Sequence, residues 1–250
     1  MNAQPPSNVK SLAGQVAVVT GASSGIGRAI AIALARQEAR LVVIGRNRAT
    51  LEETTAAAQR FSEVRNFQID LNVVGATQPL LRYLESEAGR LDILVHSAGM
   101  IQRGSLELAR VEDLDAQYAT NVRAPFELTQ RLLPLLTKAR GQVVFLNSSA
   151  GLLAKSPETG QYAATKHALK AIADSLREEV NPKGIRVLSV YLGRTATPMQ
   201  EKLFRQEGRA YHPEALLQPE DVASVVVHSL ALPPTAEVTD ISLRPMQKSY

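Results

Sequence analysis

The chain has 250 residues, of which 45% are hydrophobic and 21% are charged. These values are ordinary for a globular protein and exclude disordered, collagen-like and disulfide-scaffold classes. The chain has no cysteine, which excludes thiolate zinc sites, iron–sulfur clusters and a cysteine nucleophile. The net charge of +4 is a mild excess that no run of like charges concentrates, so we expect no nucleic-acid partner.

The first 14 residues, MNAQPPSNVKSLAG, contain no apolar segment typical of a secretion signal. No stretch of about 18 uninterrupted apolar residues occurs, so we expect no membrane-spanning helix. The sequence therefore predicts a cytoplasmic protein with an N-terminal extension over 1–14 and a single domain over 15–250.

Short β-branched apolar runs recur along the chain in a way that is typical of buried strands. They cover residues 16–20, 41–44, 64–69, 92–95, 142–147, 185–190 and 238–243. Segments with helical periodicity lie between them, at 26–38, 49–60, 77–88, 111–138, 162–180 and 219–230. This alternation predicts an α/β fold, a doubly wound seven-stranded parallel sheet with helices on both faces in three α/β/α layers.

The connection over 192–218 departs from this alternation because it is long and contains both glycine and proline. Long loops at the carboxyl ends of strands are usually lids or substrate walls, so we expect a substrate lid with one short helix. Arg205, Arg209, Tyr211 and His212 in this lid either contact an anionic substrate or form a solvated polar face.

A glycine-rich turn, TGASSGIG over residues 20–27, stands between the first strand and the first helix. Gly21 allows the tight turn, Gly25 lets the backbone approach a pyrophosphate, and Gly27 lets the helix pack closely on the strand. Free backbone N–H groups and the positive end of the helix dipole then face the phosphates. The sequence therefore predicts a dinucleotide site.

The end of the second strand indicates which dinucleotide binds. NAD-binding units carry a carboxylate there for the ribose 2′-hydroxyl, but this segment reads IGRNR over residues 44–48 and has no acid. Arg46 and Arg48 suit a 2′-phosphate through charge-assisted hydrogen bonds, unless they are solvated arginines at a helix start. We therefore expect NADP(H) rather than NAD(H) as cofactor.

Tyr162 and Lys166 lie four residues apart on one face of a predicted helix. A phenol has a pKa of about 10 and needs a nearby cation to act as an acid or base near neutrality. Lys166 supplies such a charge. This spacing is common in helices, but here it follows the glycine-rich turn and a fifth strand that ends in NSSAG, over 147–151.

In this combination and order, the motifs resemble those of the short-chain dehydrogenase/reductase family in its classical size class. The resemblance covers the chain from about residue 15 onward and implies a Rossmann-type fold. The motifs that carry it are TGASSGIG (20–27), Asp70-Leu71, Ser97-Ala98-Gly99, Asn121, the pair Ser148 and Ser149, Tyr162 with Lys166, and Gly193 with Thr197.

The resemblance implies an oxidoreductase that interconverts a carbonyl and a secondary alcohol by hydride transfer, with Asn121, Ser148, Tyr162 and Lys166 as catalytic residues. Tyr162 would donate a proton to the carbonyl oxygen or remove it from the alcohol, and the serine hydroxyl would orient that oxygen. Lys166 would lower the tyrosine pKa and bind the nicotinamide ribose. Asn121 would hold a water that connects the lysine to solvent.

The expected cofactor-binding residues are Gly21, Ser23, Ser24, Gly25, Ile26, Gly27, Arg46, Arg48, Asp70, Leu71, Ser97, Ala98, Gly99, Tyr162, Lys166, Gly193, Thr195 and Thr197. The resemblance implies that Asp70 accepts a hydrogen bond from the adenine amino group and that Thr197 binds the nicotinamide carboxamide or a phosphate. Asp70 is alternatively a turn residue, and Ser23 and Ser24 alternatively cap the first helix.

Two serines compete for the catalytic role. The family pattern Ser-x-x-Gly selects Ser148, with Gly151 three residues later, whereas the commoner family distance of thirteen residues before the tyrosine selects Ser149. We favour Ser148, because a one-residue insertion in the loop over 152–160 is easier to accommodate than a changed register at a buried strand end.

The sequence departs from the family pattern at His96, where most members have Asn, and at Leu192, where most have Pro. We expect His96 to be a hydrogen-bonded structural residue rather than a general base. The four histidines have no metal-ligand spacing, so we expect no metal site.

The expected partners are a small carbonyl or alcohol substrate and a second or further copies of the chain, as a homodimer or homotetramer. Two other functions remain open at this point. One is a catalytically silent dinucleotide-sensing regulatory protein, and the other is an epimerase or dehydratase on the same fold.

Overall fold

The computed structural model describes residues 11–247, so residues 1–10 of the expected N-terminal extension lie outside the described residues. Seven strands form one sheet in the order β3-β2-β1-β4-β5-β6-β7, and every neighbouring pair is parallel. The strands are β1 (Val16–Thr20), β2 (Arg40–Gly45), β3 (Val64–Gln68), β4 (Ile93–His96), β5 (Gln142–Ser148), β6 (Arg186–Leu192) and β7 (Asp240–Leu243).

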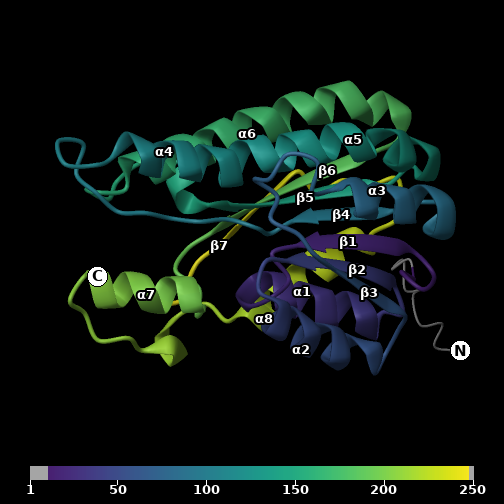
Figure 1. The fold of residues 1–250 in the computed structure, drawn as a ribbon, viewed down its shortest axis with the longest axis horizontal. Coiled ribbons are helices and arrows are strands. Elements are labelled where there is room, and N and C mark those ends of the chain that lie inside the picture. The colour runs from purple at the N-terminus through teal and green to yellow at the C-terminus, as the bar shows by residue number, and fades with distance from the viewer. Residues whose placement is uncertain (1–10, 248–250) are drawn as a thin grey trace, which may run out of the picture.

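Helices cover both faces of the sheet (Figure 1). They are α1 (Gly25–Arg36), α2 (Arg48–Gln59), α3 (Gln78–Tyr83), α4 (Val111–Tyr118), α5 (Ala124–Ala139), α6 (Gly160–Val180), α7 (Pro198–Gln206) and α8 (Pro219–Leu230). In Figure 1, α1, α2 and α8 lie below the sheet, α3 to α6 lie above it, and α7 lies beside it. The predicted three-layer, doubly wound, Rossmann-type fold is confirmed. None of the helices over 11–247 is long and apolar enough to cross a membrane.

The core lies on both faces of each central strand. In β1, Ala17 and Val19 belong to the cluster that includes α1 and α8, whereas Val16 and Val18 belong to the cluster that includes α5 and α6. A strand covered on both sides needs apolar residues at every position, which is why the strands read as continuous apolar runs. Leu12, which the sequence placed in the N-terminal extension, is fully buried in the first cluster.

The long helix expected over 111–138 is interrupted. A π-helical turn, Ala119–Arg123, separates α4 from α5, and a second one, Leu84–Ala88, follows α3. A π-helical turn is a single wider turn inside a helix, and a helical pattern in the sequence does not distinguish it from an α-helical turn. The difference matters because the first of these turns carries Asn121.

The carboxyl ends of the strands meet at one edge of the sheet. After β1 the chain turns to α1 and β2 on one side, whereas β4 lies on the other side of β1. Ligands of open α/β sheets bind in the crevice at such a switch point. The long connection after β6, with α7 as its short helix, lies at the same edge.

Candidate active site

The glycine-rich turn after β1 packs tightly against the loop after β4. A Cβ on Gly21 would lie 2.7 Å from the Ala98 backbone, and a Cβ on Gly27 would collide with the backbone of Gly21. Gly21 and Gly25 have φ angles of +66° and +53°, in the left-handed region that L side chains rarely adopt. The turn thus needs glycine for both space and backbone conformation, and α1 begins in it with unpaired N–H groups.

A cleft of about 560 Å³ runs along the carboxyl ends of the strands next to this turn. Besides the glycine-rich turn, its walls include residues 44–47 at the end of β2, 69–72 after β3 and 97–99 after β4. The cleft therefore occupies the position where parallel α/β sheets bind dinucleotides.

Two buried polar atoms in the cleft have no hydrogen-bond partner among the described residues: the Oγ of Ser23 and the Oδ1 of Asn72. Ser23 lies directly against Gly45, where a Cβ would collide with its hydroxyl. Asn72 donates through Nδ2 to the Thr120 hydroxyl at 2.9 Å, which leaves Oδ1 free. Since buried polar groups are normally paired, these atoms fit a polar ligand such as a dinucleotide. Sequence reasoning missed Asn72, whose only signal is its place after Asp70.

The structure separates the two arginines that follow β2. Arg46 lines the cleft, but Arg48 does not. Arg48 is the first residue of α2, is 77% exposed and donates to Glu52 one turn later at 2.8 Å. Asn47, which lies between them, is the N-cap of α2, and its side chain accepts a hydrogen bond from the backbone N–H of Thr50. Arg46 therefore precedes the helix, whereas Arg48 is its first residue.

A second cavity of about 240 Å³ adjoins the cleft and is lined by Ser148, Ser149, Tyr162 and Lys166. The two spaces are neighbours, since they share lining residues such as Ile26 and Thr197. Gly193, Thr195 and the first turn of α7 complete the cavity. All the expected cofactor-binding residues except Arg48 line one of the two spaces.

Ser148, Tyr162 and Lys166 meet in this cavity. Tyr162 and Lys166 lie one turn apart near the start of α6, with the lysine Nζ 5.9 Å from the centre of the tyrosine ring. Ser148 is the last residue of β5, and its hydroxyl lies near enough to the Tyr162 phenol to affect the pKa of that phenol. Ser149 is exposed at the start of a 3₁₀ turn.

Burial dominates the ionisation of these groups. It raises the pKa of Tyr162, an effect that the nearby Ser148 hydroxyl partly opposes. It lowers the pKa of Lys166 to about 8, so the ammonium form still predominates at pH 7. The lysine Nζ donates to the carbonyl of Leu146 at 2.9 Å, which anchors its charge beside the phenol.

The end of β5 is fixed against α6. The Asn147 side chain donates to the carbonyl of Lys166 at 3.1 Å and accepts from the backbone N–H of Ser148 at 2.7 Å. A Cβ on Gly151 would lie 2.6 Å from the Asn147 Oδ1 and 2.8 Å from the same carbonyl. The Ser-x-x-Gly spacing thus has a steric cause, and it sets the position of Ser148 relative to α6.

Asn121 is buried behind the cavity and does not line it. Its side chain accepts from the N–H of Met100 and donates to the carbonyl of Met100, each at 2.9 Å, and donates to the Thr165 hydroxyl at 3.0 Å. A Cβ on Gly99 would lie 3.4 Å from the Asn121 Oδ1 and 4.0 Å from the Lys166 Nζ. Asn121 therefore ties the loop after β4 to α6 close to the lysine.

His96 is buried at the end of β4. Its Nε2 forms a hydrogen bond of 2.8 Å with the Thr129 hydroxyl, and its ring stacks on Phe145 with centroids 5.0 Å apart. Burial lowers the pKa of His96 to about 3, so the ring is neutral. It lines neither space. Across residues 11–247, no three His, Asp or Glu side chains form a group suited to a metal ion.

The four polar lid residues predicted to meet an anion or solvent do not line the cavity. Arg205 forms an exposed ion pair with Glu201, and His212 lies 3.3 Å from Glu214. Tyr211 packs against a phenylalanine of α7, and Arg209 binds Glu207.

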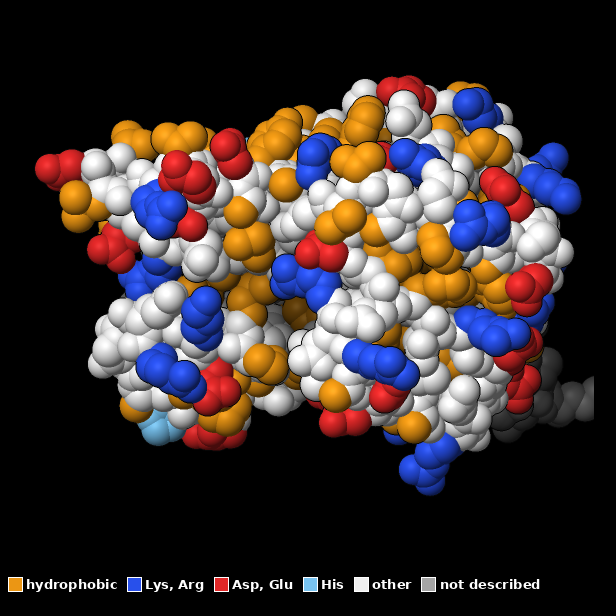
Figure 2. All heavy atoms as spheres, in the orientation of Figure 1, with side chains coloured by type: hydrophobic (Ala, Val, Ile, Leu, Met, Phe, Trp, Pro, Cys, Tyr) orange, Lys and Arg blue, Asp and Glu red, His pale blue; other side chains and the backbone are white. Residues whose placement is uncertain are grey.

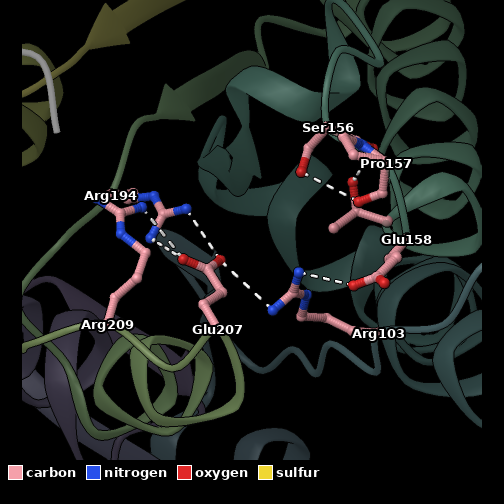
Figure 3. A network of polar contacts seen from close by, with 8 residues as sticks. Arg103, Ser156, Pro157, Glu158, Arg194, Glu207 and Arg209 are labelled. Atoms are coloured by element: carbon pink, nitrogen blue, oxygen red, sulfur yellow. Dashed lines mark hydrogen bonds and ion pairs between the residues drawn. The ribbon is translucent and has the colours of Figure 1, made fainter. Parts of the chain in front are cut away.

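Three other charged residues of this region line the cavity instead: Arg103 after β4, Arg194 after β6 and Glu207 after α7. Figure 3 shows Glu207 between Arg194 and Arg209 on one side and Arg103 on the other. Sequence reasoning missed these three residues, since no local spacing connects them.

Comparison with protein families is decisive. The model of the family described as "short chain dehydrogenase" matches residues 15–208. The chain belongs to the short-chain dehydrogenase/reductase family. This places it among the oxidoreductases, as the resemblance of its motifs predicted.

Relatives of this short-chain dehydrogenase/reductase align over nearly its whole length. An uncharacterized oxidoreductase of Staphylococcus epidermidis is 33% identical, over 93% of this chain and 97% of the relative. An uncharacterized short-chain type dehydrogenase/reductase of Sinorhizobium fredii is also 33% identical, over 92% and 91%.

Two solved structures of similar proteins contain cofactors. The alcohol dehydrogenase of Thermococcus sibiricus, complexed with 5-hydroxy-NADP, superposes with a TM-score of 0.84 at 25% identity, over 94% of this chain and 99% of that one. A metagenomic short-chain oxidoreductase in complex with NADP superposes with a TM-score of 0.81 at 29% identity, over 96% and 100%.

Proposed function

We propose that the protein is an NADP(H)-dependent oxidoreductase that interconverts a carbonyl and a secondary alcohol, with Tyr162 as acid and base. The observation that carries the proposal is that Ser148, Tyr162 and Lys166 line one cavity, which lies next to the dinucleotide cleft. The four residues expected to act in catalysis are all present, which supports an enzyme over a silent dinucleotide sensor.

The cleft would hold the dinucleotide through groups of known chemistry. The N–H groups of the glycine-rich turn suit the phosphates, Arg46 suits a 2′-phosphate, and Asp70 suits the adenine amino group. The free Oγ of Ser23 and Oδ1 of Asn72 offer further polar contacts. When bound, the nicotinamide group supplies or accepts the hydride.

In the reductive direction, the hydroxyls of Ser148 and Tyr162 donate hydrogen bonds to the substrate carbonyl oxygen. Tyr162 transfers its proton to this oxygen as negative charge develops on it. Ser148 stabilises the developing charge, and the Lys166 ammonium stabilises the phenolate that remains. In the oxidative direction Tyr162 accepts the proton from the alcohol.

A screen with reduced cofactor tests the reaction class. We expect NADPH consumption with at least one compound among ketones, aldehydes and quinones, and slower consumption with NADH. The NADP complexes among the similar structures support this preference. Consumption with NADH that equals or exceeds that with NADPH would overturn the cofactor assignment, and no consumption with any carbonyl class would overturn the reaction.

Separate alanine variants test which serine acts. Ser148→Ala is expected to lower kcat by roughly 10²–10³-fold, as removal of an oxyanion-hole donor does. Ser149→Ala, at an exposed position of the same cavity wall, serves as the matched control and is expected to keep nearly full activity. Loss of turnover in Ser149→Ala alone would reverse the assignment.

Self-association as a homodimer or homotetramer is part of the same proposal. Large apolar side chains are exposed on and near α4 and α5, and Figure 2 shows hydrophobic residues gathered along this edge of the molecule. They include Leu106, Leu108, Val111, Tyr118 and Phe126. Such an apolar patch supports a protein partner. The cytoplasmic location stays a prediction.

A further inference from the structure

The cavity beside Tyr162 has an unbalanced charge. Its charged lining residues are Arg103, Lys166, Arg194 and Glu207, so three cations face one carboxylate. Lys166 belongs to the proposed catalytic group. The other three belong to the network in Figure 3, which also includes Glu158 and Arg209 outside the cavity lining. A cavity whose walls carry an excess of one sign of charge concentrates molecules of the opposite sign.

Within this network, Glu207 already accepts hydrogen bonds from two arginines. Its carboxylate accepts two hydrogen bonds of 2.9 Å from Arg194 and one of 3.2 Å from Arg209. Both guanidinium groups also lie over the Phe204 ring, at 4.7 and 4.9 Å from its centre. Burial would raise the pKa of Glu207, but the bonds and charges of these arginines hold it below its ordinary value. The carboxylate is therefore ionised, and its oxygens are occupied by hydrogen bonds from these two arginines.

Arg103 is held differently. Its Nη2 donates to Glu158 at 2.8 Å, but its Nη1 lies 3.8 Å from Glu207, beyond hydrogen-bond distance. Its Nε is buried and has no partner among the described residues. The backbone N–H of the next residue, Gly104, donates to the carbonyl of Glu158 at 2.8 Å and fixes the base of the side chain. Arg103 is thus a positioned guanidinium with unused donors at the cavity wall.

We propose that the substrate carries a carboxylate and that Arg103 binds it. A carboxylate pairs with adjacent N–H groups of a guanidinium, and the Nη1 of Arg103 forms no hydrogen bond with the described residues, next to an Nη2 that binds Glu158. The apolar side chains of Ile101, Met199 and Leu203 line the same cavity and suit a short hydrocarbon segment. The substrate class is therefore an oxo acid or the corresponding hydroxy acid. This inference rests on the proposed function, because it names the substrate class of the same cavity.

A binding experiment tests the inference without turnover. Hexanoate and hexanamide are titrated by calorimetry into the protein, with and without NADP⁺. We expect hexanoate to bind tighter by roughly tenfold or more, the effect of a hydrogen bond between charged groups. Arg103→Met should abolish this preference, and Arg103→Lys should restore part of it. The control Arg205→Met, at an exposed lid arginine outside the cavity, should retain it.

A kinetic experiment measures the same preference in turnover. The probes are 4-oxopentanoate and 2-oxohexanoate, each compared with its methyl ester. We expect wild-type kcat/KM to favour the acids, and Arg103→Met to remove the preference mainly through KM. The melting temperature of each variant confirms that it is folded.

Equal binding of hexanoate and hexanamide, or a preference that survives in Arg103→Met, would overturn the inference. Reduction of esters as fast as acids, without a binding preference, removes the carboxylate assignment and leaves the proposed reaction intact. Absence of turnover with every carbonyl compound removes the proposed reaction, while the binding data still decide the role of Arg103.

Discussion

Tyr162→Phe is expected to lower kcat by roughly 10²–10⁴-fold, the usual contribution of a positioned general acid or base. The change removes one oxygen atom, the phenol oxygen that faces the Ser148 hydroxyl. The ring keeps its packing near the Lys166 ammonium, so the fold should be unaffected. Because the phenol is proposed to act in proton transfer, the dissociation constant of the cofactor should stay nearly unchanged.

NADPH absorbance measures the turnover of this variant, and fluorescence titration measures its cofactor affinity. Tyr191→Phe is the matched control, because Tyr191 is also a buried tyrosine but lies on β6 outside the cavity. It should keep wild-type kcat. Equal turnover in Tyr162→Phe and the wild type would remove the mechanism, since no other group in the cavity is proposed to donate the proton.

The sequence predicts most of this fold because its signals are local. The central strands contain continuous apolar runs, such as Val16 to Val19 in β1, and such runs are typical of strands with both faces covered. The glycine-rich turn and the pair Tyr162 and Lys166 are likewise defined by neighbours in the chain. Helical periodicity alone places these two side chains on one face of α6.

The contacts that the sequence does not predict join residues far apart in the chain. Asn121 ties α6 to Met100 through a π-helical turn that an apolar periodicity does not reveal. Arg103 and Glu207 meet at the cavity although more than a hundred residues separate them. Neither residue stands in a motif, so their role follows only from the folded arrangement.

Arg46 and Arg48 show that a sequence motif does not predict which of two neighbouring side chains reaches the cleft. Both fit the sequence rule for a 2′-phosphate. However, Asn47 is the N-cap of α2, so Arg48 is the first residue of the helix and pairs with Glu52 one turn later. We therefore predict that Arg46→Asp changes the cofactor preference and that Arg48→Asp does not. The first change places a carboxylate at the end of β2, where NAD-binding units have one for the ribose 2′-hydroxyl.

In Arg46→Asp, affinity for NADPH should fall roughly a hundredfold, because a pair of charge-assisted hydrogen bonds is lost, while affinity for NADH should rise. Fluorescence titration of both cofactors with both variants measures this. The size of the NADPH effect should shrink at high salt, since Arg46 is exposed and its charge is screened there. An equal loss in Arg48→Asp would mean that general surface charge, rather than a contact in the cleft, selects the cofactor.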